Sequence, residues 1–298
     1  MIDKIPMGWT SYYPMTDNES ACSLRDSMGE GVNDNIQGKF SGLILDMDGV
    51  LYRGNDALDG ARELFPALRA NNLSFILLTN NATLTAQDFT NKLARMDIDV
   101  APEDILTSAA GTATYLQKNY PEGGGVYVLG EAGLVAYVTE MPGFTLDEQR
   151  PDFVVAGLDF DFNYETMKKA CQAIRRGAHF IATNADATLP VEGGELWPGA
   201  GSIVASLETC SGIAPVVIGK PNTYMATIAL EKLGLTASRV LCVGDRLETD
   251  ILFGARAGIA TALVLTGVSS VQDIEKAEAA PTYVFDDLPH LMQGLGIA

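Results

Sequence analysis

Short apolar runs typical of buried strands alternate along this chain with runs whose apolar residues recur at helical spacing. The first strand is predicted at 43–45, the second at 74–78 and the last at 283–285, with helical segments between successive strands. Strands that are joined through helices run parallel and carry helices on both faces of their sheet. The chain is therefore predicted to be an α/β protein built on parallel sheet.

Two breaks, at 121–125 and at Ser211-Gly212, divide this alternation into parts. A Pro-Glu-Gly-Gly-Gly run at 121–125 ends the first series, and a small α/β unit with its own strands and helices is predicted over residues 121–214. The core is then predicted to consist of residues 39–120 and 215–298, on either side of that unit. Residues 1–38 are rich in Ser, Asn, Asp and Gly without a sustained period, so we expect a poorly ordered N-terminal extension.

The composition narrows the classes of function. The 298 residues carry a formal net charge of −18, which would repel a phosphate backbone or an anionic lipid surface, so we expect no nucleic-acid or membrane partner. No apolar run is long enough to span a bilayer and no secretory signal is present, so we expect a cytoplasmic protein. With only two histidines, a multi-histidine metal site is nearly excluded. The cysteines lack metal-ligand spacing and are predicted to be free thiols: Cys22, Cys171, Cys210 and Cys242.

Polar side chains follow four of the predicted strands at the point where each strand ends. The first strand delivers two acids, a pattern that by itself fits an acidic turn as well as a functional site. In parallel sheets, however, ligands bind beyond the carboxyl ends of the strands. Four predicted strands carry polar residues at that end, which favours a functional site. The residues at these ends are Asp46 and Asp48, Thr79 and Asn80, Lys220, and Asp245.

These residue types together suit the chemistry of a phosphoryl group. The carboxylates form an oxygen-rich anionic cluster, which suits Mg²⁺, and Lys220 and Thr79 offer donors to phosphate oxygens. Asp46 could then attack phosphorus and form an aspartyl-phosphate. Asp48 could protonate the leaving oxygen and later accept a proton from the attacking water. The residues thus point to a phosphoryl-transfer site.

Four motifs in order carry a resemblance to a known family. The chain resembles the haloacid dehalogenase (HAD) superfamily, and within it the subfamily IIA phosphatases of the NagD, 4-nitrophenylphosphatase and phosphoglycolate phosphatase type. The similarity runs from about Phe40 to the C-terminus. The motifs are Asp46-x-Asp48-Gly49-Val50-Leu51-Tyr52, Thr79-Asn80-Asn81, Gly219-Lys220-Pro221 and Gly244-Asp245-Arg246-Leu247-x-Thr249-Asp250.

The resemblance implies a function and a role for each motif residue. It implies a Rossmann-like core with an inserted α/β cap domain at 121–214, and a Mg²⁺-dependent phosphatase that acts on a small phosphomonoester. Asp46 is implied as the nucleophile and Asp48 as the acid/base. Mg²⁺ would bind Asp46, the backbone carbonyl of Asp48, and Asp245, with Asp250 orienting the metal shell. The residues implied to hold the phosphoryl group are Thr79, Asn80, Asn81 and Lys220.

Other functions remain open at this stage. A phosphotransferase or phosphomutase would use the same aspartate, and only its acceptor site would differ. A non-catalytic ligand-binding module is a further alternative, although Gly199-Ala200-Gly201 lacks the third glycine of the dinucleotide fingerprint. By analogy with the family, a homodimer formed through the cap is possible. The leaving group of the substrate cannot be read from the motifs, because cap side chains would select it.

Overall fold

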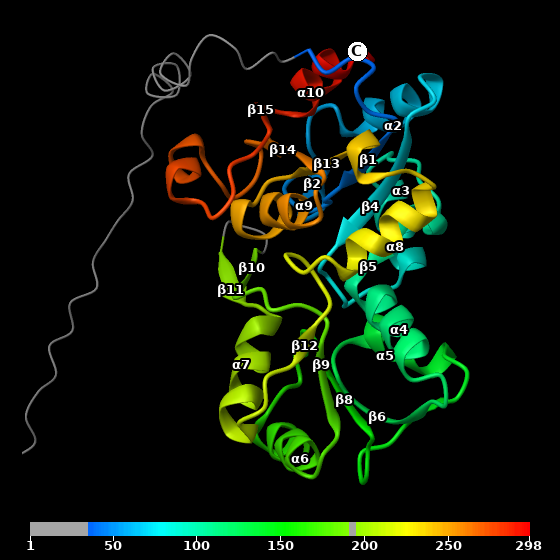
Figure 1. The fold of residues 1–298 in the computed structure, drawn as a ribbon, viewed down its shortest axis with the longest axis vertical. Coiled ribbons are helices and arrows are strands. Elements are labelled where there is room, and N and C mark those ends of the chain that lie inside the picture. The colour runs from blue at the N-terminus through cyan, green and yellow to red at the C-terminus, as the bar shows by residue number, and fades with distance from the viewer. Residues whose placement is uncertain (1–34, 191–194) are drawn as a thin grey trace, which may run out of the picture. The chain divides into compact units, whose positions relative to one another are not determined.

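The computed structural model describes residues 35–190 and 195–298, and Figure 1 shows the fold. Most of the expected N-terminal extension, residues 1–34, lies outside the described residues. Ile36, the first buried residue of the described chain, has no exposed surface, and its N–H donates to the carbonyl of Gly294 at 2.8 Å. The described fold therefore begins a few residues before Phe40.

The larger sheet has six strands, and all of its pairings are parallel. The strand order is β15-β14-β13-β1-β4-β5. Because β1 lies between β13 and β4, the residues after these three strands come together at one edge (Figure 1). The strands are β1 (Gly42–Leu45), β4 (Ser74–Thr79), β5 (Ile105–Thr107), β13 (Val240–Gly244), β14 (Ala260–Val264) and β15 (Tyr283–Phe285).

Helices cover both faces of this sheet. Leu43 and Leu45 of β1 belong to one buried apolar cluster, which includes side chains of α2, α3 and α10, whereas Ile44 belongs to a second cluster with α4, α8 and α9. This split is the side-chain alternation of a strand that is buried on both faces. The helices are α2 (Ala61–Ala70), α3 (Ala86–Ala94), α4 (Ser108–Asn119), α8 (Tyr224–Leu233), α9 (Leu252–Arg256) and α10 (Leu288–Leu295).

A second sheet has five parallel strands in the order β12-β9-β8-β6-β7. One of its faces shares the second apolar cluster with α4 and α8, and its other face packs with α6 and α7 (Figure 1). The strands are β6 (Gly124–Leu129), β7 (Phe144–Leu146), β8 (Phe153–Ala156), β9 (His179–Ala182) and β12 (Val216–Val217). The helices are α5 (Ala132–Glu140), α6 (Tyr164–Arg175) and α7 (Ala200–Ser211).

Short elements complete the described chain. Two antiparallel hairpins follow the ends of parallel strands, β2 (Tyr52–Arg53) with β3 (Asp56–Ala57), and β10 (Thr188–Pro190) with β11 (Leu196–Pro198). Among the described residues, three segments are 3₁₀-helical and one, η4, is π-helical. They are η1 (Pro102–Asp104), η3 (Ala237–Arg239), η4 (Leu247–Ile251) and η5 (Val271–Lys276).

The structure confirms the predicted α/β fold with parallel, Rossmann-like sheets and differs from the expected elements in detail. Residues 215–298 were expected to belong with the core, but β12 at the start of this range pairs with β9 of the second sheet. The segment that leads into α9 is a π-helical turn, η4, which begins at Leu247. The two hairpins were not predicted, because two- and three-residue strands carry too few side chains to show an alternating pattern.

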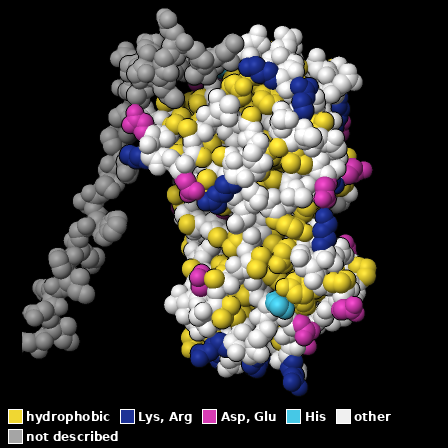
Figure 2. Space-filling view, in the orientation of Figure 1, with side chains coloured by type: hydrophobic (Ala, Val, Ile, Leu, Met, Phe, Trp, Pro, Cys, Tyr) yellow, Lys and Arg dark blue, Asp and Glu magenta, His cyan; other side chains and the backbone are white. Residues whose placement is uncertain are grey.

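The surface carries charges of both signs. On the face shown in Figure 2, acidic and basic side chains are scattered among apolar and neutral ones. Of the helices in the described parts of the chain, none combines the length and the hydrophobicity that a membrane-spanning segment needs.

We expect Gly133→Ala to lower the stability of the protein, because α5 packs closely against the loop after β4 at this residue. A methyl group at Gly133 of α5 would lie 2.7 Å from the Cα of Leu84, in the loop after β4, where backbone cannot rotate away. Overpacking of this kind costs about 1 to 3 kcal/mol of the free energy of unfolding. Denaturant unfolding followed by circular dichroism measures this loss.

The matched control is Gly111→Ala in α4. There the added methyl meets the flexible Met225 side chain at 3.1 Å, and the gain in helix propensity, about 1 kcal/mol, offsets the contact. Equal stabilities of the two variants would contradict the assignment of Gly133 as a close-packing position.

Candidate active site

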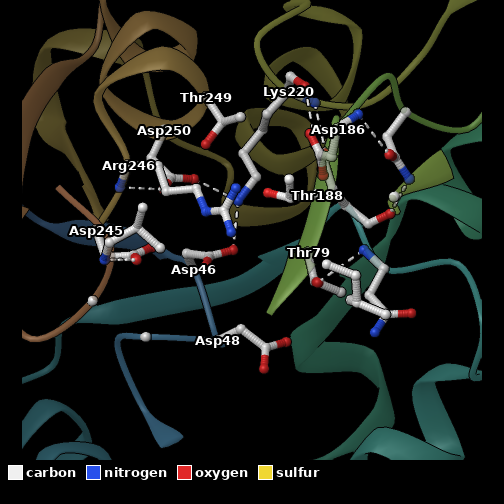
Figure 3. Close-up of a pocket in the computed structure, with 18 of the residues that line it drawn as sticks. Asp46, Asp48, Thr79, Asp186, Thr188, Lys220, Asp245, Arg246, Thr249 and Asp250 are labelled. Atoms are coloured by element: carbon white, nitrogen blue, oxygen red, sulfur yellow. Dashed lines mark hydrogen bonds and ion pairs between the residues drawn. The ribbon is translucent and has the colours of Figure 1, made fainter. Parts of the chain in front are cut away.

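Three carboxylates meet at the edge of the six-stranded sheet. Asp46 directly follows β1, Asp245 directly follows β13, and Asp250 lies on η4 (Figure 3). One carboxylate oxygen from each lies within 4.8 Å of the other two. The cluster follows from the topology, because β1 and β13 pair in register up to Leu45 and Val243 and so end side by side.

Glycines make room for these carboxylates. A Cβ atom at Gly244 would overlap the side chain of Asp250, and one at Gly267 would overlap that of Asp245. Gly49 has φ 79°, a left-handed conformation that glycine adopts without strain, and a Cβ there would lie 2.6 Å from Oδ2 of Asp245. The glycines of the first and fourth motifs are therefore explained by close approach of the acidic side chains.

Lys220 reaches the carboxylates from the segment between β12 and α8. Its Nζ donates to Oδ1 of Asp46 at 2.5 Å and to Oδ1 of Asp250 at 2.6 Å. The three side chains are 5%, 12% and 2% exposed, respectively, so solvent screens these ion pairs very little. Burial opposes the charge on Lys220, but Asp250 and Asp46 outweigh it and hold the pKa of the ammonium above its usual value.

The carboxylates outnumber the cations that face them. Burial raises the pKa of Asp46 well above its usual value, and the charges of Asp250 and Asp245 add to this effect against the opposing charge of Lys220. Burial, followed by the charge of Asp250, raises the pKa of Asp245 to about 7. A buried cluster of carboxylate oxygens with a deficit of positive charge fits a hard divalent cation. The three carboxylates are therefore suited to bind a divalent metal ion.

Asp48 lies at the same edge and is held separately from the other acids. The hydroxyl of Tyr52 donates to Oδ2 of Asp48 at 3.3 Å, and Nζ of Lys92 lies 3.9 Å from the centre of the Tyr52 ring. Burial raises the pKa of Asp48, while Lys92 and the hydrogen bond from Tyr52 act in the opposite direction. Asp48 therefore retains its proton to a higher pH than an exposed aspartic acid.

The loop after β4 connects the two sheets at the site. Oγ1 of Thr79 accepts from the backbone N–H of Asn81 at 3.1 Å, which leaves the hydroxyl proton available. Nδ2 of Asn80 donates to both carboxylate oxygens of Asp186, at 3.0 and 3.1 Å, and to the carbonyl of Lys220 at 3.0 Å. Oδ1 of Asn80 accepts from the N–H of Lys220 at 2.8 Å. The side-chain amide of Asn80 thus binds protein groups on its donor and acceptor sides.

A cavity of about 620 Å³ brings all the predicted site residues together. Its other wall comes from the second sheet and the segments that follow β8 and β9. That wall includes Leu158, Asn184, Asp186, Thr188 and Leu189. The core-side residues that line the cavity are Asp46, Asp48, Thr79, Asn80, Asn81, Lys220, Asp245 and Asp250.

Other residues lie outside this cavity. Asp159 lines a smaller groove with Phe160 and Trp197, and its Oδ1 accepts from the N–H of Asp161. Cys171, Cys210 and Cys242 are free thiols outside the cavity, and Cys22 lies outside the described residues. The cavity also contains Arg246, whose position inside the fourth motif was visible in the sequence but was assigned no role.

The fold and the site define an α/β enzyme with acids and a lysine gathered at the ends of parallel strands. The family model of haloacid dehalogenase-like hydrolases matches residues 43–144, and a HAD-hydrolase-like model matches residues 217–291. Together these matches cover more than half of the chain.

Similar proteins of known name support the same assignment. An acid sugar phosphatase of Staphylococcus aureus is 40% identical over 250 residues, which are 84% of this chain and 96% of that protein. The crystal structure of a 4-nitrophenylphosphatase from Thermotoga maritima is 38% identical with a TM-score of 0.82, covering 89% of this chain and 100% of that one. NagD from E. coli K-12 is 37% identical with a TM-score of 0.77, covering 84% and 97%.

The chain belongs to the haloacid dehalogenase-like hydrolase family. The predicted resemblance is thereby confirmed, and so is the prediction that the chain is an enzyme, a HAD-type phosphatase.

We expect the stability of the metal-free protein to fall as the pH rises. The pKa of Asp245 is about 7 in the folded protein and 3.8 for an ordinary aspartic acid, so the folded state holds a proton that the unfolded chain releases. The resulting stabilisation is complete below the unfolded value and is lost as the pH rises through the folded value. Thermal unfolding in a chelator should give a lower midpoint at about pH 8 than at about pH 5.

Asp245→Asn tests the origin of this slope, because the amide does not titrate. The variant should show a shallower pH dependence, and added Mg²⁺ should raise the midpoint of the parent protein most at high pH, where the carboxylates are ionised. A midpoint that rises with pH in the chelator would contradict the inferred carboxylate cluster.

Proposed function

We propose that this protein is a Mg²⁺-dependent phosphomonoester hydrolase that forms an aspartyl-phosphate on Asp46. The observation that carries the proposal is the contact of Lys220 with Asp46 and Asp250 inside a buried cluster that also contains Asp245. A nucleophilic carboxylate, a fixed ammonium and a metal-binding donor set are the parts that phosphoryl transfer requires.

Asp46, Asp245 and the backbone carbonyl of Asp48 would hold the Mg²⁺ ion. Both oxygens of Asp250 already accept from the chain, Oδ1 from Lys220 and Oδ2 from the N–H of Arg246 at 3.1 Å, which supports an orienting role for Asp250 rather than direct ligation. When bound, the ion supplies positive charge to the phosphate oxygens and lowers the electrostatic cost of bringing a dianion to these acids.

Lys220 fixes the nucleophile. By binding Oδ1 of Asp46, it sets the orientation of the other carboxylate oxygen, which would form the new bond to phosphorus as the bond to the leaving oxygen breaks. The hydroxyl of Thr79, with the loop through Asn80 and Asn81, would hold the phosphoryl oxygens. In this assignment Asn80 contributes by holding the backbone of Lys220 at both its N–H and its carbonyl.

Asp48 would carry the proton in both half-reactions. Protonated, it would donate to the leaving oxygen as the aspartyl-phosphate forms, and then, as a carboxylate, it would accept a proton from the water that attacks phosphorus. The second step releases inorganic phosphate and regenerates the carboxylate of Asp46. Tyr52 supports this role, because its hydroxyl donates to Oδ2 of Asp48 and so helps to fix the orientation of that carboxyl group.

The second sheet would serve as the cap, with residues 121–214 forming an inserted domain. Asp186 from this part binds Asn80 of the core, so the second wall of the cavity is tied to the phosphoryl site. Such a wall excludes water while the aspartyl-phosphate forms. The names of the relatives, acid sugar phosphatase and 4-nitrophenylphosphatase, support small phosphomonoesters as substrates. No observation favours phosphotransfer to a second substrate.

Asp46→Asn is expected to abolish turnover, because the amide cannot attack phosphorus. Phosphate release from a panel of phosphomonoesters, with and without Mg²⁺, measures the effect, and chelation of the parent enzyme should reduce the rate to the same background. Activity that survives either treatment would sink the aspartyl-phosphate mechanism. A circular dichroism spectrum of the variant shows whether its fold is retained.

Asp48→Asn is expected to separate the two half-reactions. With 4-nitrophenyl phosphate, a good leaving group, the variant should release a burst of about one nitrophenolate per enzyme and then turn over slowly, since water activation is lost. With an alkyl phosphate the formation of the phosphoenzyme should itself slow by about 10²- to 10⁴-fold.

The pH dependence of the parent enzyme provides a second test of proton transfer by Asp48. Because burial raises the pKa of Asp48, phosphoenzyme formation from an alkyl phosphate should persist above the pH at which an ordinary aspartic acid ionises, and decline at higher pH. Rapid-quench measurements across pH test this. An unchanged alkyl phosphate rate in Asp48→Asn would remove Asp48 from the proton transfer.

A further inference from the structure

The cavity contains a cation that the proposed mechanism does not use. Arg246 follows Asp245 and lines the cavity half-buried, and its guanidinium makes no hydrogen bond or ion pair with any described residue. Arg53, the other arginine of the cavity, differs because its Nη2 donates to the carbonyl of Thr266. A guanidinium has five N–H donors, so a half-buried one without a protein partner offers these donors to a ligand.

The position of Arg246 is on the leaving-group side of the site. Its backbone N–H is fixed by Oδ2 of Asp250, and Figure 3 shows its side chain among those that line the cavity. Burial raises the pKa of Asp48 and of Asp186, which line the cavity from the core and from the second sheet, and the charge of Arg246 is among the effects that oppose this rise. Since Asp48 is the group that would protonate the leaving oxygen, a cation in reach of both acids lies where the leaving group must be.

The groups around this position define a ligand chemistry. Asp186 is held by Asn80 and presents a carboxylate acceptor, while Thr188 presents a hydroxyl. Hydroxyl groups of a ligand can accept from Arg246 and donate to Asp186 at the same time. A leaving group with a second negative charge would instead be repelled by Asp186, and an aromatic one would leave both side chains unpaired.

We propose that Arg246 binds the leaving group of the substrate and, with Asp186, selects leaving groups that carry several hydroxyl groups, as in sugar and polyol phosphates. This assignment rests on the proposed phosphatase function and adds to it a residue that distinguishes between substrates. Arg246 comes from the core and Asp186 from the second sheet, so both walls of the cavity would contact the leaving group of the substrate.

The test compares Arg246→Met with the matched variant Arg53→Met in the full chain. For each, kcat/KM is measured with an aldohexose phosphate and with 4-nitrophenyl phosphate, whose leaving group has no such hydroxyls. Loss of a hydrogen bond to a charged group should lower the preference for the hexose phosphate by about 10- to 100-fold in Arg246→Met, mainly through KM. Arg53→Met should leave this preference unchanged.

Two further readouts separate binding of the leaving group from other roles. Inhibition by inorganic phosphate should have the same constant in Arg246→Met as in the parent enzyme. In the Asp46→Asn background, which would prevent turnover, calorimetry should show weaker binding of the hexose phosphate when Arg246 is also replaced. A failure of the proposed function would be recognised separately, because hydrolysis would survive Asp46→Asn. That result does not depend on whether Arg246 is replaced.

Two results would overturn the proposal. An equal fall for both substrates with weaker phosphate inhibition would mean that Arg246 acts on the phosphoryl group or through Asp245. An unchanged substrate preference with unchanged binding of the hexose phosphate would mean that the guanidinium serves no ligand.

Discussion

The candidate site is built around one electrostatic arrangement, the Lys220 ammonium held between Asp46 and Asp250 in a nearly solvent-free environment. A buried ion pair is weak support for stability, because desolvation of the charges offsets much of their attraction. This cluster is more unfavourable still, since Asp245 adds a third carboxylate and its pKa rises to about 7. The fold therefore maintains an anionic site that becomes favourable only when positive charge is supplied. That property is a cost for the empty protein and an advantage for binding metal and phosphate.

The parallel sheet makes such a cluster possible. Neighbouring parallel strands end at one edge, so β1 and β13 bring Asp46 and Asp245 together without any long-range turn chemistry. Lys220 arrives differently, from the segment that leaves the second sheet after β12. The Asn80 amide joins the two sources, because it binds Asp186 of one sheet's loop and the backbone of Lys220 while it follows β4 of the other. The position of the ammonium is thus coupled to the position of the second sheet.

This difference explains what could be predicted from the sequence. The strand at 43–45 and the acids after it follow from local pattern, because an apolar run and its polar end are adjacent in the chain. The membership of β12 could not be predicted, since two residues, Val216 and Val217, carry no signal for one sheet over another. The engagement of Asn80 with Asp186 joins positions 106 residues apart and depends on packing of the two sheets. Arg246 was visible within its motif, but its lack of a protein partner is a property of the folded structure alone.

The two walls of the cavity follow different physical constraints. On the core wall, glycines at 49, 244 and 267 leave no space for larger side chains beside the acids, so the geometry of the acidic cluster tolerates little change. On the other wall, Leu158, Thr188 and Leu189 lie in loops and a short hairpin, where substitutions disturb fewer packed neighbours. Substrate preference can therefore change on the second wall while the phosphoryl chemistry stays the same. Arg246 is the exception: a core residue, fixed by Asp250, that faces the variable part of the substrate.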